Sequence, residues 1–268
     1  MSNSIGFNYK QKYLSFLYEF IGTTLFLYAV LMTRDPAAIV FTLFASTVIF
    51  GRVSNGHFNP AISTSVLIGQ DINIDQFWAY LLYVSAQCLA AFPAVLLAQA
   101  SLHSGTFSHV ELNRIHRLCP QSTANTNFPE EFLCENEDGT EGFHMDYQIL
   151  IIQAVGTLVL CFVLNYVTGK YSASKDQGLR GLSYASTFML LIYTARRQGW
   201  CFNPAVALAI CLQEAYNAPN AHDYLFRYTY AYVSGPIIGA LLSGLIYMAY
   251  EAEIAPKDDK EEVVGKDE

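Results

Sequence analysis

Two short sequences in this chain combine residue types that start a helix with residue types that bind a polar solute. Each is an Asn-Pro-Ala box, made by Asn59, Pro60 and Ala61 in the first half and by Asn203, Pro204 and Ala205 in the second. Asn is a preferred helix N-cap because its side-chain oxygen accepts a bond from an early backbone N–H. Pro is favoured at the first helical position. The amide nitrogen of each Asn is still a hydrogen-bond donor, so each box predicts a helix start with a donor at its tip.

The apolar stretch after each box is too short to cross a membrane. The stretches run from about residue 61 to 69 and from about 205 to 212. Nine residues rise about 14 Å as a helix, and the hydrocarbon core of a bilayer is about 30 Å thick. A helix also carries partial positive charge at its N-terminus. The sequence therefore predicts two half-helices whose positive ends point inward.

Composition indicates the environment in which these half-helices lie. The chain has 268 residues, of which 53% are hydrophobic and 14% charged, whereas soluble domains have about 25% charged residues. A membrane protein with several spans fits this composition. We expect spans at about 13–31, 37–50, 77–98, 147–167, 181–194 and 224–250, with a long polar outer loop at 101–146.

The two halves of the chain resemble each other. The segment 19–23 (EFIGT) parallels 153–157 (QAVGT), and 83–91 parallels 232–240. Each half then has three spans and one half-helix, so the second half enters the membrane from the opposite face. We therefore predict two inverted repeats, at 13–98 and 147–250. Interrupted helices at matching positions of inverted repeats are typical of a transport pathway.

The paired Asn-Pro-Ala boxes resemble those of the major intrinsic protein family, which comprises the aquaporins and glycerol facilitators. The resemblance covers about residues 13–250. It implies an all-α membrane protein with six transmembrane helices and two re-entrant half-helices. It also implies a homotetramer in the lipid bilayer, with Asn59 and Asn203 as donors to small neutral permeants. We expect no cofactor and no metal site.

In the family, a Glu on the first span of each repeat braces the backbone of a re-entrant loop. Glu19 matches this pattern, whereas Gln153 keeps an acceptor and loses the charge. The brace of the second loop is therefore expected to be weaker or differently bonded.

The selectivity filter is where the chain departs from the family. Typical members have an Arg directly after the second box, and Val206 stands there in this chain. By the family's usual spacing, the filter positions are Ile39, Leu191, Trp200 and Val206. Such a filter is apolar and aromatic, so it discriminates poorly by hydrogen bonding. Glycerol channels also have an Asp after the filter Arg, and Ala207 does not match it.

We therefore expect a passive channel for water or small neutral solutes such as glycerol, hydrogen peroxide or ammonia. Opposed half-helix dipoles and the two Asn donors would exclude protons and ions. A second interpretation is a non-conducting subunit, derived from such a channel, that has a structural role in a larger membrane assembly. We find no nucleophile motif, phosphate-binding loop or paired catalytic carboxylates, so an enzyme is not expected.

Charge and cysteine positions suggest how the chain is oriented. Nine of the 15 Lys and Arg residues fall on the side of both termini, which favours cytoplasmic termini. We expect residues 1–12 to form a polar cytoplasmic segment and residues 251–268 an acidic, disordered tail. Cys119 and Cys134 lie in the long outer loop, where we predict that they form a disulfide. The chain has no basic patch, so nucleic acid is not an expected partner.

Overall fold

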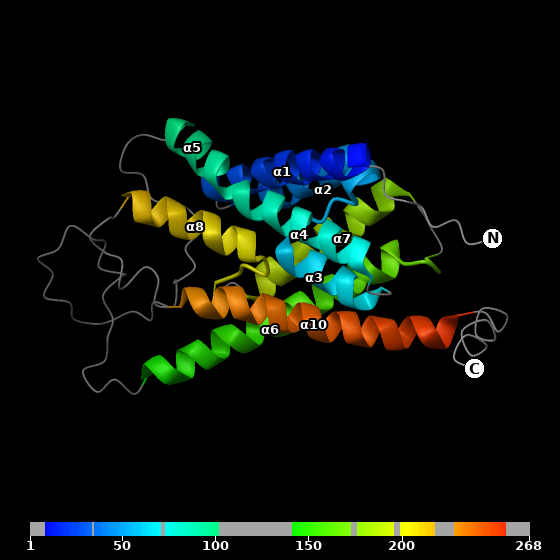
Figure 1. Ribbon diagram of the computed structural model, residues 1–268. Helices are drawn as coiled ribbons and strands as arrows, with labels where there is room; N and C mark the ends of the chain where they lie inside the picture. The colour runs from blue at the N-terminus through cyan, green and yellow to red at the C-terminus, as the bar shows by residue number, and fades with distance from the viewer. Residues whose placement is uncertain are drawn as a thin grey trace, which may run out of the picture.

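The computed structural model describes residues 9–33, 35–70, 73–101, 141–172, 176–195, 199–217 and 228–255. These residues form helices and no strands (Figure 1). The helices are α1 (Tyr9–Met32), α2 (Pro36–Ser54), α3 (Pro60–Gly69), α4 (Ile74–Leu89), α5 (Ala91–Ser101), α6 (Glu141–Thr168), α7 (Gln177–Thr194), α8 (Pro204–Asn217) and α10 (Thr229–Ile254).

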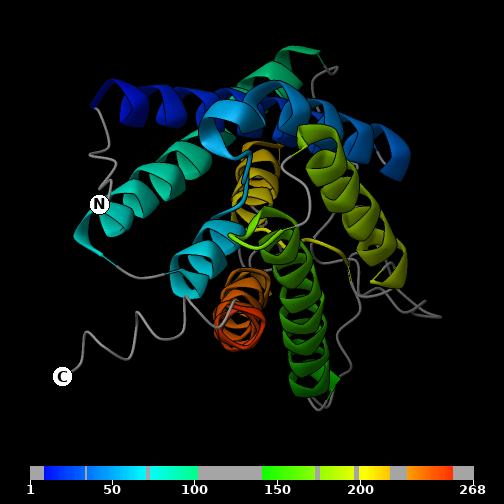
Figure 2. The same ribbon diagram turned by 90° about the vertical axis from the view of Figure 1, so that its right-hand side faces the viewer.

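The long helices surround the two short ones. Figure 2 looks along the bundle and shows α8, in yellow, with α1 and α2 above it, α7 and α6 on one side, α10 below it and α4 on the other side. In Figure 1, α3 and α8 approach the middle of the bundle from opposite ends. The start of α1 and the end of α10 lie at the same end of the bundle (Figure 1). This arrangement is the one expected for two inverted repeats.

Five described segments are long and apolar enough to cross a membrane. They are Lys12–Met32, Pro36–Ser54, Ile74–Ser101, Tyr147–Thr168 and Thr229–Ile254. The third combines α4 and α5, which are separated only at Ala90. Pro93 explains this break, because it has no N–H to donate to the carbonyl of Leu89. The remaining expected span corresponds to α7, whose first turns contain Gln177 and Arg180.

Several helices extend beyond the apolar stretches that were expected to span. α1 begins at Tyr9, inside the expected N-terminal segment, and α6 begins at Glu141, inside the expected polar loop. α10 continues to Ile254, so the first residues of the expected acidic tail are helical. Hydropathy identifies only the part of a helix that lies in lipid, whereas backbone hydrogen bonds continue through polar turns. Residues 102–140 and 256–268 lie outside the described part of the chain.

Candidate pore between two half-helices

Each Asn-Pro-Ala box starts a half-helix in the expected way. The Asn59 side-chain oxygen accepts a hydrogen bond from Ala61 N at 2.9 Å at the start of α3. The Asn203 oxygen accepts the same bond from Ala205 N at 2.9 Å at the start of α8. Both Asn oxygens are therefore used as N-caps, and the amide nitrogens are left for other partners.

The tips of the two half-helices are joined by a reciprocal pair of hydrogen bonds. Asn59 Nδ2 donates to the carbonyl of Phe202 at 2.9 Å, and Asn203 Nδ2 donates to the carbonyl of Phe58 at 2.9 Å. The positive ends of α3 and α8 thus face each other at one place. An amide nitrogen carries two hydrogens, so one hydrogen of each Asn remains after this bond is made.

The residue before each Asn adopts the same uncommon backbone conformation. Phe58 has a φ of 48° and Phe202 a φ of 55°, in the left-handed region that bulky residues rarely occupy. Their rings lie against Gly22 of α1 and Gly156 of α6, where an added Cβ would overlap them. The two glycines let each ring pack directly on a helix backbone, and this packing holds the loop in its strained form.

Glu19 holds the first loop (residues 55–59). Its Oε1 accepts from His57 N at 3.0 Å, and its Oε2 accepts from Phe58 N at 2.8 Å. Oε2 also accepts from Gln87 Nε2 at 2.8 Å. The Glu19 side chain is fully buried, so three donors compensate the loss of water around its carboxyl group.

Gln153 holds the second loop (residues 199–203) with one acceptor and one donor. Its Oε1 accepts from Phe202 N at 2.8 Å, and its Nε2 donates to the carbonyl of Gly199 at 2.9 Å. The charge that the family pattern has at this position is absent, and a bond to a backbone carbonyl is gained in its place. The second loop is thus bonded differently from the first.

A polar chain behind the first loop was not found from the sequence. Gln87 Nε2 donates to Ser63 Oγ at 3.0 Å, and Ser63 Oγ lies 3.1 Å from His57 Nδ1. On the other side of the loop, the hydroxyl of Tyr184 donates to the His57 carbonyl at 3.0 Å. In the sequence, Gln87 stands out only as a polar residue in the apolar third span. The sequence does not show which residues its amide binds.

The comparisons with known proteins agree with this geometry. The family model described as "Major intrinsic protein" matches residues 7–247. The chain belongs to the major intrinsic protein family. It is 24% identical over 257 residues to a probable TIP-type aquaporin of Antirrhinum majus, covering 87% of this chain and 85% of that one.

Other members of the family show the same level of similarity. The chain is 24% identical over 238 residues to the glycerol uptake facilitator protein-like 6 of Lactiplantibacillus plantarum, covering 85% of this chain and 94% of that one. The crystal structure of the aquaglyceroporin from Plasmodium falciparum matches with a TM-score of 0.58 and 15% identity, over 88% of this chain and 96% of that one. The fold is therefore aquaporin-like, and the protein is an integral membrane protein of a family of channels.

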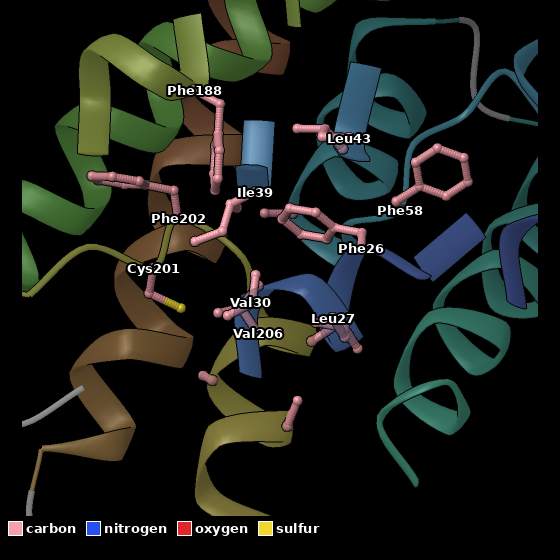
Figure 3. Close-up of a cluster of buried hydrophobic side chains, with 14 of the residues drawn as sticks. Phe26, Leu27, Val30, Ile39, Leu43, Phe58, Phe188, Cys201, Phe202 and Val206 are labelled. Carbon is pink, nitrogen blue, oxygen red and sulfur yellow. The ribbon is translucent and has the colours of Figure 1, made fainter. Parts of the chain in front are cut away.

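The four positions predicted for the filter of this family member lie in one apolar cluster. Ile39 and Val206 are fully buried and Leu191 is 7% exposed, whereas Trp200 is half-buried and packs against the same cluster. Figure 3 shows Ile39 of α2 beside Phe26 and Phe188, and Val206 of α8 next to Val30 of α1. Whether these positions select solutes remains a prediction.

The cysteines divide between described and undescribed parts of the chain. Cys201 is buried, and its Sγ donates to the carbonyl of Asn203 at 3.0 Å. It also lies 4.0 Å from the carbonyl of Tyr232, which Pro236 of α10 leaves without its usual helical donor. Cys119 and Cys134 lie outside the described residues, and their disulfide stays a prediction. The described residues contain no group of His, Cys, Asp and Glu that could hold a metal.

Proposed function

We propose that this protein is a passive channel for water and small neutral solutes, among them glycerol, hydrogen peroxide and ammonia. The observation that carries the proposal is the reciprocal pair of hydrogen bonds across the tips of α3 and α8, from Asn59 to the Phe202 carbonyl and from Asn203 to the Phe58 carbonyl. It presents two amide donors and two helix N-termini at one point. A solute oxygen at that point can accept a bond from the remaining hydrogen of each Asn.

The same point would repel cations. Each helix N-terminus carries about half an elementary positive charge, and two of them face each other at a buried point of the protein. Apolar side chains beyond that point, such as Ile39 and Val206, offer nothing in place of the hydration shell of an ion. A neutral solute loses fewer hydrogen bonds on entry, so this arrangement favours neutral over charged permeants.

The apolar filter positions suggest which neutral solutes pass. Val206 supplies neither the charge nor the donors that an Arg would supply, so a solute with apolar surface meets a smaller desolvation penalty there. A glycerol facilitator among the relatives is consistent with this preference. We further propose a homotetramer in the bilayer with both chain termini on the cytoplasmic side, as the distribution of Lys and Arg favours.

Swelling of proteoliposomes tests the channel function. Vesicles that contain the full chain should swell faster than empty vesicles in gradients of water, glycerol or hydrogen peroxide. Val206→Arg should reduce glycerol flux more than water flux, because the charged side chain narrows and polarises the filter. Val206→Leu is the matched control, since it adds volume without charge. Swelling equal to that of empty vesicles for every solute would reject the proposal.

One observation favours a second candidate, a non-conducting structural subunit of a membrane assembly. Asn59 is fully buried and Asn203 is 1% exposed. A side chain that lines a lumen wide enough for water retains surface that water can touch. The pathway is therefore closed in this conformation, either for regulation or because it does not conduct. Absence of flux for all solutes, from a protein that folds and assembles, would favour this second function.

A further inference from the structure

Partly exposed side chains lie on either side of the fully buried stretch of the pathway. Trp200 at the outer end and His57 at the inner end are each half-buried. The side chains between them, including Ile39 and Asn59, are fully buried. The most deeply buried part of the pathway therefore lies inside the protein, between the outer filter positions and the Asn pair.

Phe188 occupies this stretch. It precedes Leu191 by three positions on α7, so the two side chains share one face of the helix. Three residues rise about 4.5 Å, which places Phe188 one layer deeper than the filter position. The ring of Phe188 is 1% exposed, and Figure 3 shows it beside Ile39 of α2.

The ring of Phe188 is held by other rings from both halves of the chain. It meets Phe26 of α1 with centroids 5.8 Å apart and Trp200 of the second loop at 5.7 Å. It also meets Phe202 and Tyr184, each at 6.4 Å. All four contacts are close to edge-to-face, with interplanar angles between 72° and 88°, the favoured arrangement for aromatic pairs. The ring thus bridges α1, α7 and the second loop.

We propose that Phe188 closes the pathway in this conformation and is a specificity-determining residue of the channel. The proposal depends on the proposed channel function for its effect on flux, but the obstruction itself is a separate property. The sequence reasoning did not find Phe188, because the family's filter spacing points to Leu191. A flat ring that must be displaced admits small solutes more readily than large ones, so the side chain at position 188 should set the size limit.

Flux through smaller side chains tests this inference. Phe188→Ala should raise the swelling rate of proteoliposomes severalfold in a water gradient and, to a greater extent, in a glycerol gradient. Phe188→Leu should give an intermediate rate and serves in place of Phe188→Ala if that variant does not fold. The matched control is Phe44→Ala. Phe44 lies 144 residues earlier, at the corresponding position of the first repeat, and its ring packs against Gly181 where α2 meets α7. Its loss should leave flux unchanged.

A second measurement detects the obstruction without flux. Ile39→Cys introduces a thiol beside the Phe188 ring, and its reaction with methyl methanethiosulfonate is followed by mass spectrometry of the tryptic peptide. With Phe188 present the reaction should be slow, and with Phe188→Ala it should be severalfold faster. Equal rates in the two backgrounds would overturn the inference.

The two measurements separate the inference from the channel function. If the Ile39→Cys thiol becomes reactive with Phe188→Ala but no solute passes, Phe188 is the obstruction and the proposed channel function fails. If the unaltered chain already conducts and Phe188→Ala changes neither flux nor reactivity, the channel function stands and the inference about Phe188 is wrong.

Discussion

Each re-entrant loop is held by one buried side chain of a neighbouring helix, but the two side chains differ. At the first loop, Glu19 of α1 accepts bonds from His57 N, Phe58 N and the Gln87 amide. At the second loop, Gln153 of α6 accepts from one backbone N–H and donates to one backbone carbonyl. A carboxylate offers only acceptors, whereas an amide offers an acceptor oxygen and a donor nitrogen. The backbone groups of each loop that face Glu19 or Gln153 are therefore the ones that this side chain can bind.

This difference shows how an inverted repeat can diverge without losing its fold. The backbone conformations before each Asn are alike, with Phe58 and Phe202 both in the left-handed region. The cross-loop bonds are alike too, at 2.9 Å in both directions. The braces, which lie farther from the tips, have diverged. Symmetry is thus retained where the half-helices touch and lost where each loop is anchored separately.

Removal of the braces should have the largest effect and should distinguish the two loops. Glu19→Ala leaves His57 N and Phe58 N without their acceptor and removes one of the two bonds of the Gln87 amide, so we expect a loss of stability of about 3–5 kcal/mol. Gln153→Ala leaves only Phe202 N and the Gly199 carbonyl, which should cost about 2–3 kcal/mol. The measurement is unfolding of the purified protein in a mixed-detergent titration. Equal losses for the two variants would mean that the third hydrogen bond of Glu19 contributes nothing to stability.

An exchange of brace chemistry should also destabilise the second loop. Gln153→Glu replaces the donor that faces the Gly199 carbonyl with a second oxygen. When the carboxyl group is ionised, two acceptors face each other in a buried site, which should cost about 2–4 kcal/mol at high pH, and the cost should fall at low pH, where the protonated group can donate to the carbonyl. The same detergent titration measures the change, and Gln153→Met, which keeps the volume and removes both polar groups, is the control. A more stable Gln153→Glu variant would show that the second loop does not depend on a donor at this position.

The two Asn residues should behave alike, in contrast to the braces. Asn59→Ala and Asn203→Ala each remove an N-cap and a cross-loop bond, so each should cost about 2 kcal/mol. Asn59→Asp and Asn203→Asp keep the capping oxygen and lose the donor, and they separate the two contributions. A clear difference in stability between the two positions would contradict the symmetry of the cross-loop pair.

Much of the fold could be predicted from the sequence because its signals are local. An Asn before a Pro indicates a helix start in both boxes, and the short apolar run after the first box gave the length of its half-helix. α3 ends at Gly69, as expected, and α8 continues to Asn217, beyond the expected end near residue 212. Apolar runs also located the spans, although not their polar ends.

The contacts that complete the site could not be predicted because they join distant residues. Nothing near Gln87 shows that its amide reaches Glu19, 68 positions earlier. Phe188 is one of 18 Phe residues in an apolar chain, and its sequence neighbours do not distinguish it from a packing residue. The acceptors of the Asn amides are backbone carbonyls, which leave no mark in the sequence. The family's spacing places the filter position of α7 at Leu191, about one helical turn from Phe188, whose ring closes the pathway.

The smallest effect should come from a contact that only the first loop has. The Tyr184 hydroxyl donates to the His57 carbonyl at 3.0 Å, and at the corresponding position of the first repeat, 144 residues earlier, Val40 has no hydroxyl. Tyr184→Phe keeps the ring and removes this bond, so stability should fall by about 1 kcal/mol. The freed carbonyl would become an acceptor near the inner end of the pathway. If water flux rises while stability falls, the hydroxyl of Tyr184 normally prevents permeants from binding this carbonyl. If water flux is unchanged, Tyr184 only anchors the loop.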